Sequence, residues 1–209
     1  MEYDMIGLIG RKIGMTQIYK DNGEMCPATA LEVGPCPVIQ IKNSDGKDGY
    51  NAVKLGFWKC KKVLKPIKGI VSKLGLEGLK VMREFRVDNV GEYQTGTVLK
   101  ANVFEVGDTV MVRGTMKGRG FAGVTKRYRF KGGDDTHGCR ANRIPGSMGG
   151  SSDPSRIFKG KRLPGHYGAV SHTIKGLEVL LVDPENDMIF VKGAVPGPRK
   201  GIVFVTKQG

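Results

Sequence analysis

The chain has 209 residues, with 34 Lys or Arg against 20 Asp or Glu, which gives a formal net charge of +14. A sequence pI of about 9.7 is typical of proteins that bind nucleic acid. No apolar run approaches the roughly 18 residues that a membrane-spanning helix needs, and the acidic start Met1-Glu2-Tyr3-Asp4 differs from a basic secretory signal. We therefore expect a cytoplasmic protein with no membrane partner.

The first half of the chain is expected to form short β-strands separated by turns. Asp21, Asn22 and Gly23 are a strong hairpin signal, because Asn and Gly accept a positive φ with little strain. Gly34 and Pro35 then break the chain before the next strand. The four strands predicted here, which suggest a meander, are residues 16–19, 25–33, 38–42 and 50–58.

Residues 59–76 contain the best candidate for a helix. Pro66 can begin it, four apolar residues from Ile67 to Leu74 follow at helical spacing, and Gly75 can end it. Strands are predicted again within residues 79–87, 97–99, 104–112, 177–182, 188–192 and 202–206. A mainly β fold with a closed or nearly closed β-barrel suits so many short strands, since closure removes exposed strand edges.

Residues 113–168, which we call the basic arm, differ in composition from the rest of the chain. They hold 13 Lys or Arg against three Asp, 13 of the 32 glycines, and only 14 apolar residues out of 56. A flexible cationic segment with so little apolar surface cannot compensate for the conformational entropy that it loses on ordering. We therefore expect it to become ordered when it binds a polyanion, and nucleic acid is the obvious candidate. Because barrel strands flank it, we predict a long, largely irregular insertion in a globular body of residues 1–112 and 169–209.

The cysteines and histidines do not indicate a metal site. Cys26, Cys36, Cys60 and Cys139 stand far apart without a Cys-x-x-Cys pair, so neither a zinc ribbon nor a disulfide framework is suggested, and reduced thiols are expected. His137 and Cys139 could supply two metal ligands, but no second close-spaced pair completes a site. We expect no metal.

Two weak signals for cofactor binding or catalysis have ordinary alternatives. Residues 118–123 have the spacing of a dinucleotide-binding fingerprint after a predicted strand, but a basic segment follows them instead of a helix and an acidic residue for the ribose. Asp134, Asp135 and His137 could form an acid and base pair, although adjacent carboxylates after two glycines are more often turn chemistry. No P-loop exists. We expect no catalytic residue, no cofactor and no small-molecule substrate.

The basic arm has the composition of an RNA-binding segment. Its glycines near residue 120 let the backbone approach phosphates closely, while neighbouring cations neutralise them. Between Lys126 and Lys131, cations alternate with Tyr128 and Phe130, as expected where phosphate contact and base stacking occur together. The alternative is an amphipathic strand whose aromatic rings face the barrel. Residues 144–154 are mostly small and uncharged until Asp153, and we predict that they form the arm's tip, with a disordered loop end as the alternative.

Several separate motifs run in order along nearly the whole chain. They are residues 6–16 (IGLIGRKIGMT), 114–123 (GTMKGRGFAG) with Arg127, 136–138 (THG), 145–147 (PGS), 158–161 (FKGK) and 191–197 (VKGAVPG). Together they resemble the ribosomal protein L-three family of the bacterial large subunit. The resemblance implies a closed β-barrel of the translation-protein type with one short helical segment, and a long loop that threads into ribosomal RNA toward the peptidyl transferase centre. It also implies binding of large-subunit ribosomal RNA early in assembly, contacts with neighbouring large-subunit ribosomal proteins through the barrel, and no catalysis.

Two sets of residues in the basic arm are expected to carry this function. Those expected to bind ribosomal RNA are Lys117, Arg119, Lys126, Arg127, Tyr128, Arg129, Lys131, His137, Arg140, Arg143, Arg156, Lys159, Lys161 and Arg162. Those expected at the loop tip, nearest to the catalytic RNA, are Ser147, Met148, Gly149, Gly150, Ser151, Ser152 and Asp153.

The chain departs from the family pattern at three positions. Met111 stands where the family usually has Asp or Asn, and Met116 where it usually has Ser or Thr, which removes polar groups at the arm's root. Gly150 occupies the position at which some bacterial members carry a methylated glutamine, so that modification is expected to be absent. The alternatives to a structural ribosomal protein are an RNA-modifying or RNA-cleaving enzyme and a soluble translation factor with the same barrel.

Overall fold

A computed structural model describes residues 7–208 with the exception of Asp21 and Glu77. The acidic start of the chain and Asp21 of the predicted hairpin turn lie outside the described residues. The chain divides into two compact units: a body unit formed by residues 1–115 and 171–209, and an arm unit formed by Met116–Val170.

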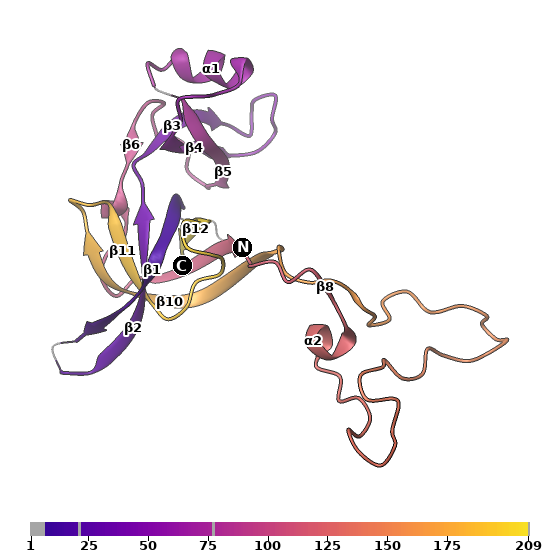
Figure 1. Ribbon diagram of the computed structural model, residues 1–209. Coiled ribbons are helices and arrows are strands. Elements are labelled where there is room, and N and C mark those ends of the chain that lie inside the picture. Colours follow the sequence, from indigo (N-terminus) through magenta and orange to yellow (C-terminus); the bar gives the residue numbers. More distant parts are fainter. Residues whose placement is uncertain (1–6, 21, 77, 209) are drawn as a thin grey trace. The chain divides into compact units, whose positions relative to one another are not determined.

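Six strands of the body unit pair in a closed ring. They are β1 (Leu8–Tyr19), β2 (Met25–Val33), β7 (Thr109–Thr115), β10 (Ser171–Asp183), β11 (Met188–Lys192) and β12 (Ile202–Lys207). Every pair is antiparallel, and the order β1-β12-β7-β10-β11-β2 returns to β1 through the long hairpin that β1 and β2 form (Figure 1). Each of these strands therefore has a neighbour on both sides.

The ring buries every second side chain of its shorter strands. In β7, β11 and β12, buried residues alternate with half-buried or exposed ones, as the two-residue period of a strand requires. Val110 and Val112 of β7, Ile189 of β11, and Val203 and Val205 of β12 are fully buried. β-Branched side chains at these positions suit the pleated, packed face of a sheet.

A second sheet of the body unit lies outside the ring and corrects the sequence prediction. Its strands are β3 (Cys36–Lys42), β4 (Ala52–Lys59), β5 (Leu79–Arg86) and β6 (Val98–Leu99), in the order β5-β4-β3-β6. The predicted meander of four strands was therefore wrong, because β2 and β3 belong to different sheets. Gly34, at φ +93°, turns the backbone, and Pro35 has no amide hydrogen to continue the β2 ladder.

The predicted helix is confirmed as α1 (Lys65–Ser72), which has Pro66 in its first turn. Val71 packs with Ile39 of β3 and Leu79 of β5 in a small apolar cluster, so α1 is held against the second sheet. The expectation of one helical segment was wrong. A 3₁₀ turn (Ala101–Val103) precedes β7, and a second helix, α2 (Val124–Tyr128), lies in the arm unit. None of the described helices is long and apolar enough to cross a membrane.

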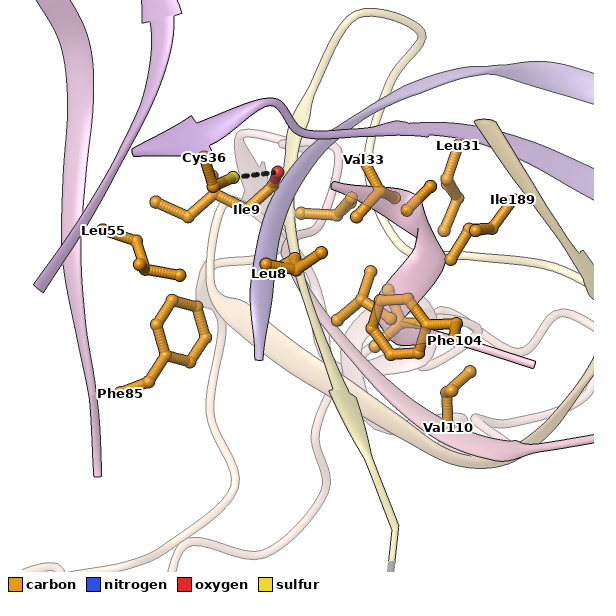
Figure 2. Packing of buried hydrophobic residues seen from close by; sticks show 14 of the residues in the cluster. Leu8, Ile9, Leu31, Val33, Cys36, Leu55, Phe85, Phe104, Val110 and Ile189 are labelled. Carbon is orange, nitrogen blue, oxygen red and sulfur yellow. Dashed lines mark hydrogen bonds between the residues drawn. The ribbon is translucent and has the colours of Figure 1, made fainter. Parts of the chain in front are cut away.

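One apolar core joins the ring to the second sheet. Figure 2 shows Leu55 and Phe85 of the second sheet on one side of β1, and Leu31, Phe104 and Ile189 on the other. Leu8 and Ile9 are adjacent in β1 and therefore point to opposite faces of the strand, and both are fully buried. β1 thus contributes side chains to both halves of the core.

The buried thiol of Cys36 lies at this junction. Cys36 Sγ donates a hydrogen bond to the carbonyl oxygen of Ile9 at 3.3 Å, drawn in Figure 2. Burial raises the pKa of the Cys36 thiol to about 12. The thiolate, which is the nucleophile and the metal ligand, is therefore suppressed, and Cys36 acts as a small apolar side chain. All four cysteines are free.

Truncation of the core is expected to destabilise the body unit strongly. Leu31 is fully buried, so Leu31→Ala should lower the free energy of unfolding by about 2–5 kcal/mol through lost burial and the cavity left behind. Urea unfolding followed by circular dichroism measures this change. The matched control is Val106→Ala at a side chain that is 65% exposed, for which a change within about 0.5 kcal/mol is expected. A loss below about 1 kcal/mol in Leu31→Ala would contradict the described packing.

An ion pair at the β7–β12 edge predicts sensitivity to acid. Lys207 Nζ lies 2.7 Å from Asp108 Oδ1, and the amide of Glu105 donates to Asp108 Oδ2 at 2.9 Å. Burial is the largest single effect and opposes ionisation of Asp108. The hydrogen bonds from Lys207 and from the Glu105 amide, together with the charge of Lys207, outweigh burial and lower the pKa of Asp108 below its ordinary value of 3.8. When folding lowers the pKa of a carboxyl group, the ionised group stabilises the folded protein at pH values above its unfolded-state pKa. This stabilisation is lost as the pH falls through the folded-state pKa.

We therefore expect the free energy of unfolding to decline below about pH 4, with a shallower decline in Asp108→Asn than in the parent protein. Urea titrations between neutral and strongly acidic pH measure both curves. Parallel curves for the two proteins would show that Asp108 ionises alike in the folded and unfolded states.

Candidate nucleic-acid interface

The root of the arm unit is a short antiparallel ladder. β8 (Phe121–Ala122) pairs with β9 (Gly165–His166). The ladder is extended by three backbone hydrogen bonds, from Arg119 N to Tyr167 O at 2.8 Å, from Tyr167 N to Gly120 O at 2.9 Å, and from Met116 N to Val170 O at 2.9 Å. The outgoing and returning limbs of the arm therefore run side by side at the root.

α2 follows the glycine-rich segment of the outgoing limb. Ala122 and Val124 are the buried residues of the arm unit, and the burial of Val124 anchors the first turn of α2. The expectation that no helix follows residues 118–123 was therefore wrong, and so was the alternative that residues 126–131 form an amphipathic strand. The helix has only five residues and no acidic residue in its first turn, so it does not complete a dinucleotide-binding unit.

Arg127 connects α2 to the returning limb. Its Nη1 donates a hydrogen bond to the carbonyl oxygen of Leu163 at 2.8 Å. A Cβ atom at Gly165 would lie 2.6 Å from the same Nη1, so only glycine leaves room for the guanidinium at this position. Arg127, the one half-buried cation among the predicted RNA-binding residues, therefore positions the arm.

Tyr128 is also held by contacts within the arm unit. The guanidinium carbons of Arg127 and Arg162 lie 5.0 and 5.8 Å from the centre of its ring, and the ring of Phe130 lies 6.3 Å away. Cation–π contacts of this kind stabilise by about 0.5–1 kcal/mol each at exposed sites. The structure thus brings Arg127, Tyr128, Phe130 and Arg162 together, although Arg162 follows Arg127 by more than 30 residues in the sequence.

The remaining predicted RNA-binding residues are exposed. They are Lys117, Arg119, Lys126, Arg129, Lys131, His137, Arg140, Arg143, Arg156, Lys159, Lys161 and Arg162. Within the part of the chain that the structure describes, none of these side chains forms an ion pair. Their positive charge is therefore not neutralised by any carboxylate that the structure describes.

The predicted loop tip, Ser147 to Asp153, is exposed throughout. Gly149 has φ +137°, a conformation that side chains other than glycine's rarely adopt, and its amide donates to Ser147 Oγ at 3.4 Å. A Cβ atom at Gly150 would lie 2.7 Å from the carbonyl oxygen of Asp153. Glycine at position 150 therefore permits a close turn that a glutamine side chain would push apart.

Two exposed aromatic rings were missed in the choice of site residues. Phe121 is 72% exposed and lies edge-on to His166 with ring centres 6.1 Å apart. Phe158 is 61% exposed, and the guanidinium of Arg156 lies 5.7 Å from its ring centre. Each ring is adjacent in sequence to a glycine or a cation, which is the signal that could have identified them. They present more free ring surface to an unpaired base than Tyr128 does.

The acidic residues of the arm form no recognisable catalytic or metal centre. Asp134, Asp135 and His137 are exposed in an irregular segment. Among the residues that the structure describes, no group of three or more His, Cys, Asp or Glu side chains could hold a metal ion. The arm therefore presents cations, glycines and aromatic rings, which is the chemistry of phosphate contact and base stacking.

Comparisons with known proteins identify the family of the chain. The family model described as Ribosomal protein L3 matches residues 73–187, which include the whole basic arm. A Large ribosomal subunit protein uL3 from Thermotoga petrophila is 50% identical over 198 residues, covering 95% of each chain. A protein with the same name from Alkaliphilus metalliredigens is 48% identical over 210 residues, covering 98% of this chain and 100% of that relative. The chain belongs to the Ribosomal protein L3 family, as the sequence motifs predicted.

Hydrogen exchange in the RNA-free protein is expected to separate the arm's root from its outer part. The amides of Met116, Arg119 and Tyr167 should be protected by the ladder, whereas most amides of residues 133–162 should exchange rapidly because few of them have a backbone partner. Arg127→Gln should speed exchange at the root by about tenfold or more, since a charged hydrogen bond is lost. Lys126→Gln, which removes the same charge from an exposed side chain, should leave root exchange unchanged.

Proposed function

We propose that the protein is a structural constituent of the large ribosomal subunit, located in the cytoplasmic ribosome, whose basic arm binds large-subunit ribosomal RNA. The observation that carries this proposal is the set of exposed arm cations without carboxylate partners among the described residues. Surface charges of one sign repel each other, so the chain gains nothing in stability from concentrating them. A polyanion removes that repulsion and releases its condensed counterions.

The proposed mechanism is electrostatic and structural. The ladder and Arg127 set the direction of the two limbs, and the outer part of the arm orders as its cations replace counterions along RNA. Phe121 and Phe158 offer surfaces for unpaired bases. The tip from Ser147 to Asp153 has small side chains that fit a crowded site, and we assign it to the neighbourhood of the peptidyl transferase centre. RNA binding of this kind would occur early in subunit assembly.

In this proposal the body unit is the platform. The ring of six strands is assigned as the translation-protein-type barrel, with the second sheet attached to it through the shared core. Its outer faces would meet neighbouring large-subunit ribosomal proteins. Membership of the Ribosomal protein L3 family supports a structural, non-enzymatic role and argues against an RNA-modifying or RNA-cleaving enzyme. A soluble translation factor, by contrast, would dissociate from subunits at moderate salt.

Binding to a transcript of large-subunit ribosomal RNA is expected to weaken steeply with salt. If about six arm cations contact phosphates, the logarithm of the association constant should fall with a slope of roughly four to five against the logarithm of salt concentration. The triple variant Lys117→Gln, Lys126→Gln, Lys159→Gln should reduce that slope by about two to three. Filter binding across a salt series measures both values.

The control variant carries Lys47→Gln, Lys100→Gln and Lys175→Gln, which remove the same charge from exposed body lysines. We expect its slope to stay close to that of the parent protein. Equal slopes for the arm variant and the control would refute the proposed role of the arm.

A further inference from the structure

A second concentration of positive charge lies in the body unit around α1. Residues 59–73 contain six lysines and no acidic residue. Outside that segment, the predicted body of residues 1–112 and 169–209 has 15 basic and 17 acidic residues, so its remaining charge is slightly negative. The modest positive charge of the body as a whole therefore comes from one short stretch.

Five of these lysines, Lys61, Lys62, Lys65, Lys68 and Lys73, form what we call the lysine cluster. All five are exposed. None of them forms an ion pair within the described part of the chain. Among the described residues, the cluster therefore resembles the basic arm in having cations without carboxylate partners, but it lies on α1 and on the segments directly before and after this helix.

The lysine cluster surrounds a preformed hollow. Lys61, Lys62 and Lys68 line a hollow of about 410 Å³ together with Cys60 and Gly78. The floor is fixed, because the amide of Cys60 donates to the carbonyl oxygen of Gly78 at 2.7 Å and Cys60 Sγ donates to the carbonyl oxygen of Lys62 at 3.2 Å. A Cβ atom at Gly78 would lie 2.5 Å from the carbonyl oxygen of Cys60, so the chain approaches itself as closely as glycine allows.

Lys65 of the cluster is placed unfavourably for the helix that carries it. Lys65 is the first residue of α1, and the first turn of that helix has no acidic residue. The N-terminus of a helix carries partial positive charge, which disfavours a cation there, and like charges on neighbouring turns repel. Positive charge placed against local helix electrostatics indicates selection for a partner.

From this arrangement we propose that the lysine cluster is a second RNA-binding site, which holds phosphates of folded RNA on the body unit independently of the basic arm. Lysine supplies compact charges with three donors each, which suit phosphate oxygens. The choice of RNA as the polyanion rests on the proposed function. The site itself is supported by the hollow, the exposed ammonium groups and the lack of ion pairs to these lysines among the described residues.

The test uses the full-length protein and a transcript of large-subunit ribosomal RNA. The cluster variant carries Lys61→Gln, Lys62→Gln and Lys68→Gln; the control is again Lys47→Gln, Lys100→Gln, Lys175→Gln. Gln and Lys have similar helix propensities, and an unchanged thermal unfolding midpoint checks that α1 persists. We expect the cluster variant to reduce the salt slope by about two to three and to lower affinity at least tenfold near physiological salt. Lys→Arg at the same three positions should retain binding.

Hydroxyl-radical footprinting distinguishes the two sites. The cluster variant and the arm variant should each expose a different set of RNA nucleotides. If only the arm variant loses protection, and the cluster variant matches the control in slope, the lysine cluster is not an RNA site. This conclusion would stand even if the cluster variant entered subunits poorly. Poor entry into subunits with unchanged RNA binding would indicate that the lysine cluster contacts an acidic protein partner. If only the cluster variant loses binding, the proposed function of the arm fails while this inference stands.

Discussion

The antiparallel ladder between β7 and β10 fixes both ends of the basic arm. Thr115 pairs with Ser171 and Gly114 with His172, and Arg113 Nε donates to Ser171 Oγ at 2.8 Å. Because β7 also pairs with β12 and β10 with β11, this ladder is one segment of the closed ring. The entropic cost of closing a loop grows only slowly with the length of the loop. The ladder between β7 and β10, which closes the arm, therefore tolerates a long insertion. The body can therefore carry a segment with almost no apolar core of its own.

Turn chemistry made most strands of the body predictable. Strands β2 and β11 begin and end where the sequence indicated, and α1 begins beside Pro66. Residues 8–15 of β1 were missed because the glycines in this part of the strand weaken any strand pattern. The structure gives the reason for Gly10: a Cβ atom there would lie 2.6 Å from the carbonyl oxygen of Glu32 on β2. Which strands share a sheet was not predictable, because β1 and β12 meet only through pairing of residues distant in the sequence.

The candidate site was predictable in its charges but not in the roles of individual side chains. The exposure of the arm cations could be predicted directly from composition, because burying so many charged side chains without partners is unfavourable. Arg127 and Tyr128, however, form contacts with Leu163 and Arg162 that no local pattern encodes. The lysine cluster was concealed for a different reason. Averaging charge over the whole body cancelled the six lysines of residues 59–73 against acidic residues elsewhere in the body.

The pairing of β1 with β12 has a consequence for the order in which the chain acquires structure. Leu8 pairs with Val205 and Arg11 with Ile202, so one edge of β1 stays without its neighbour until nearly the entire described chain has been translated. Contacts between such distant segments form slowly. The second sheet and the basic arm both emerge during this interval. The cationic segment of the nascent polypeptide is therefore complete while the ring is still open.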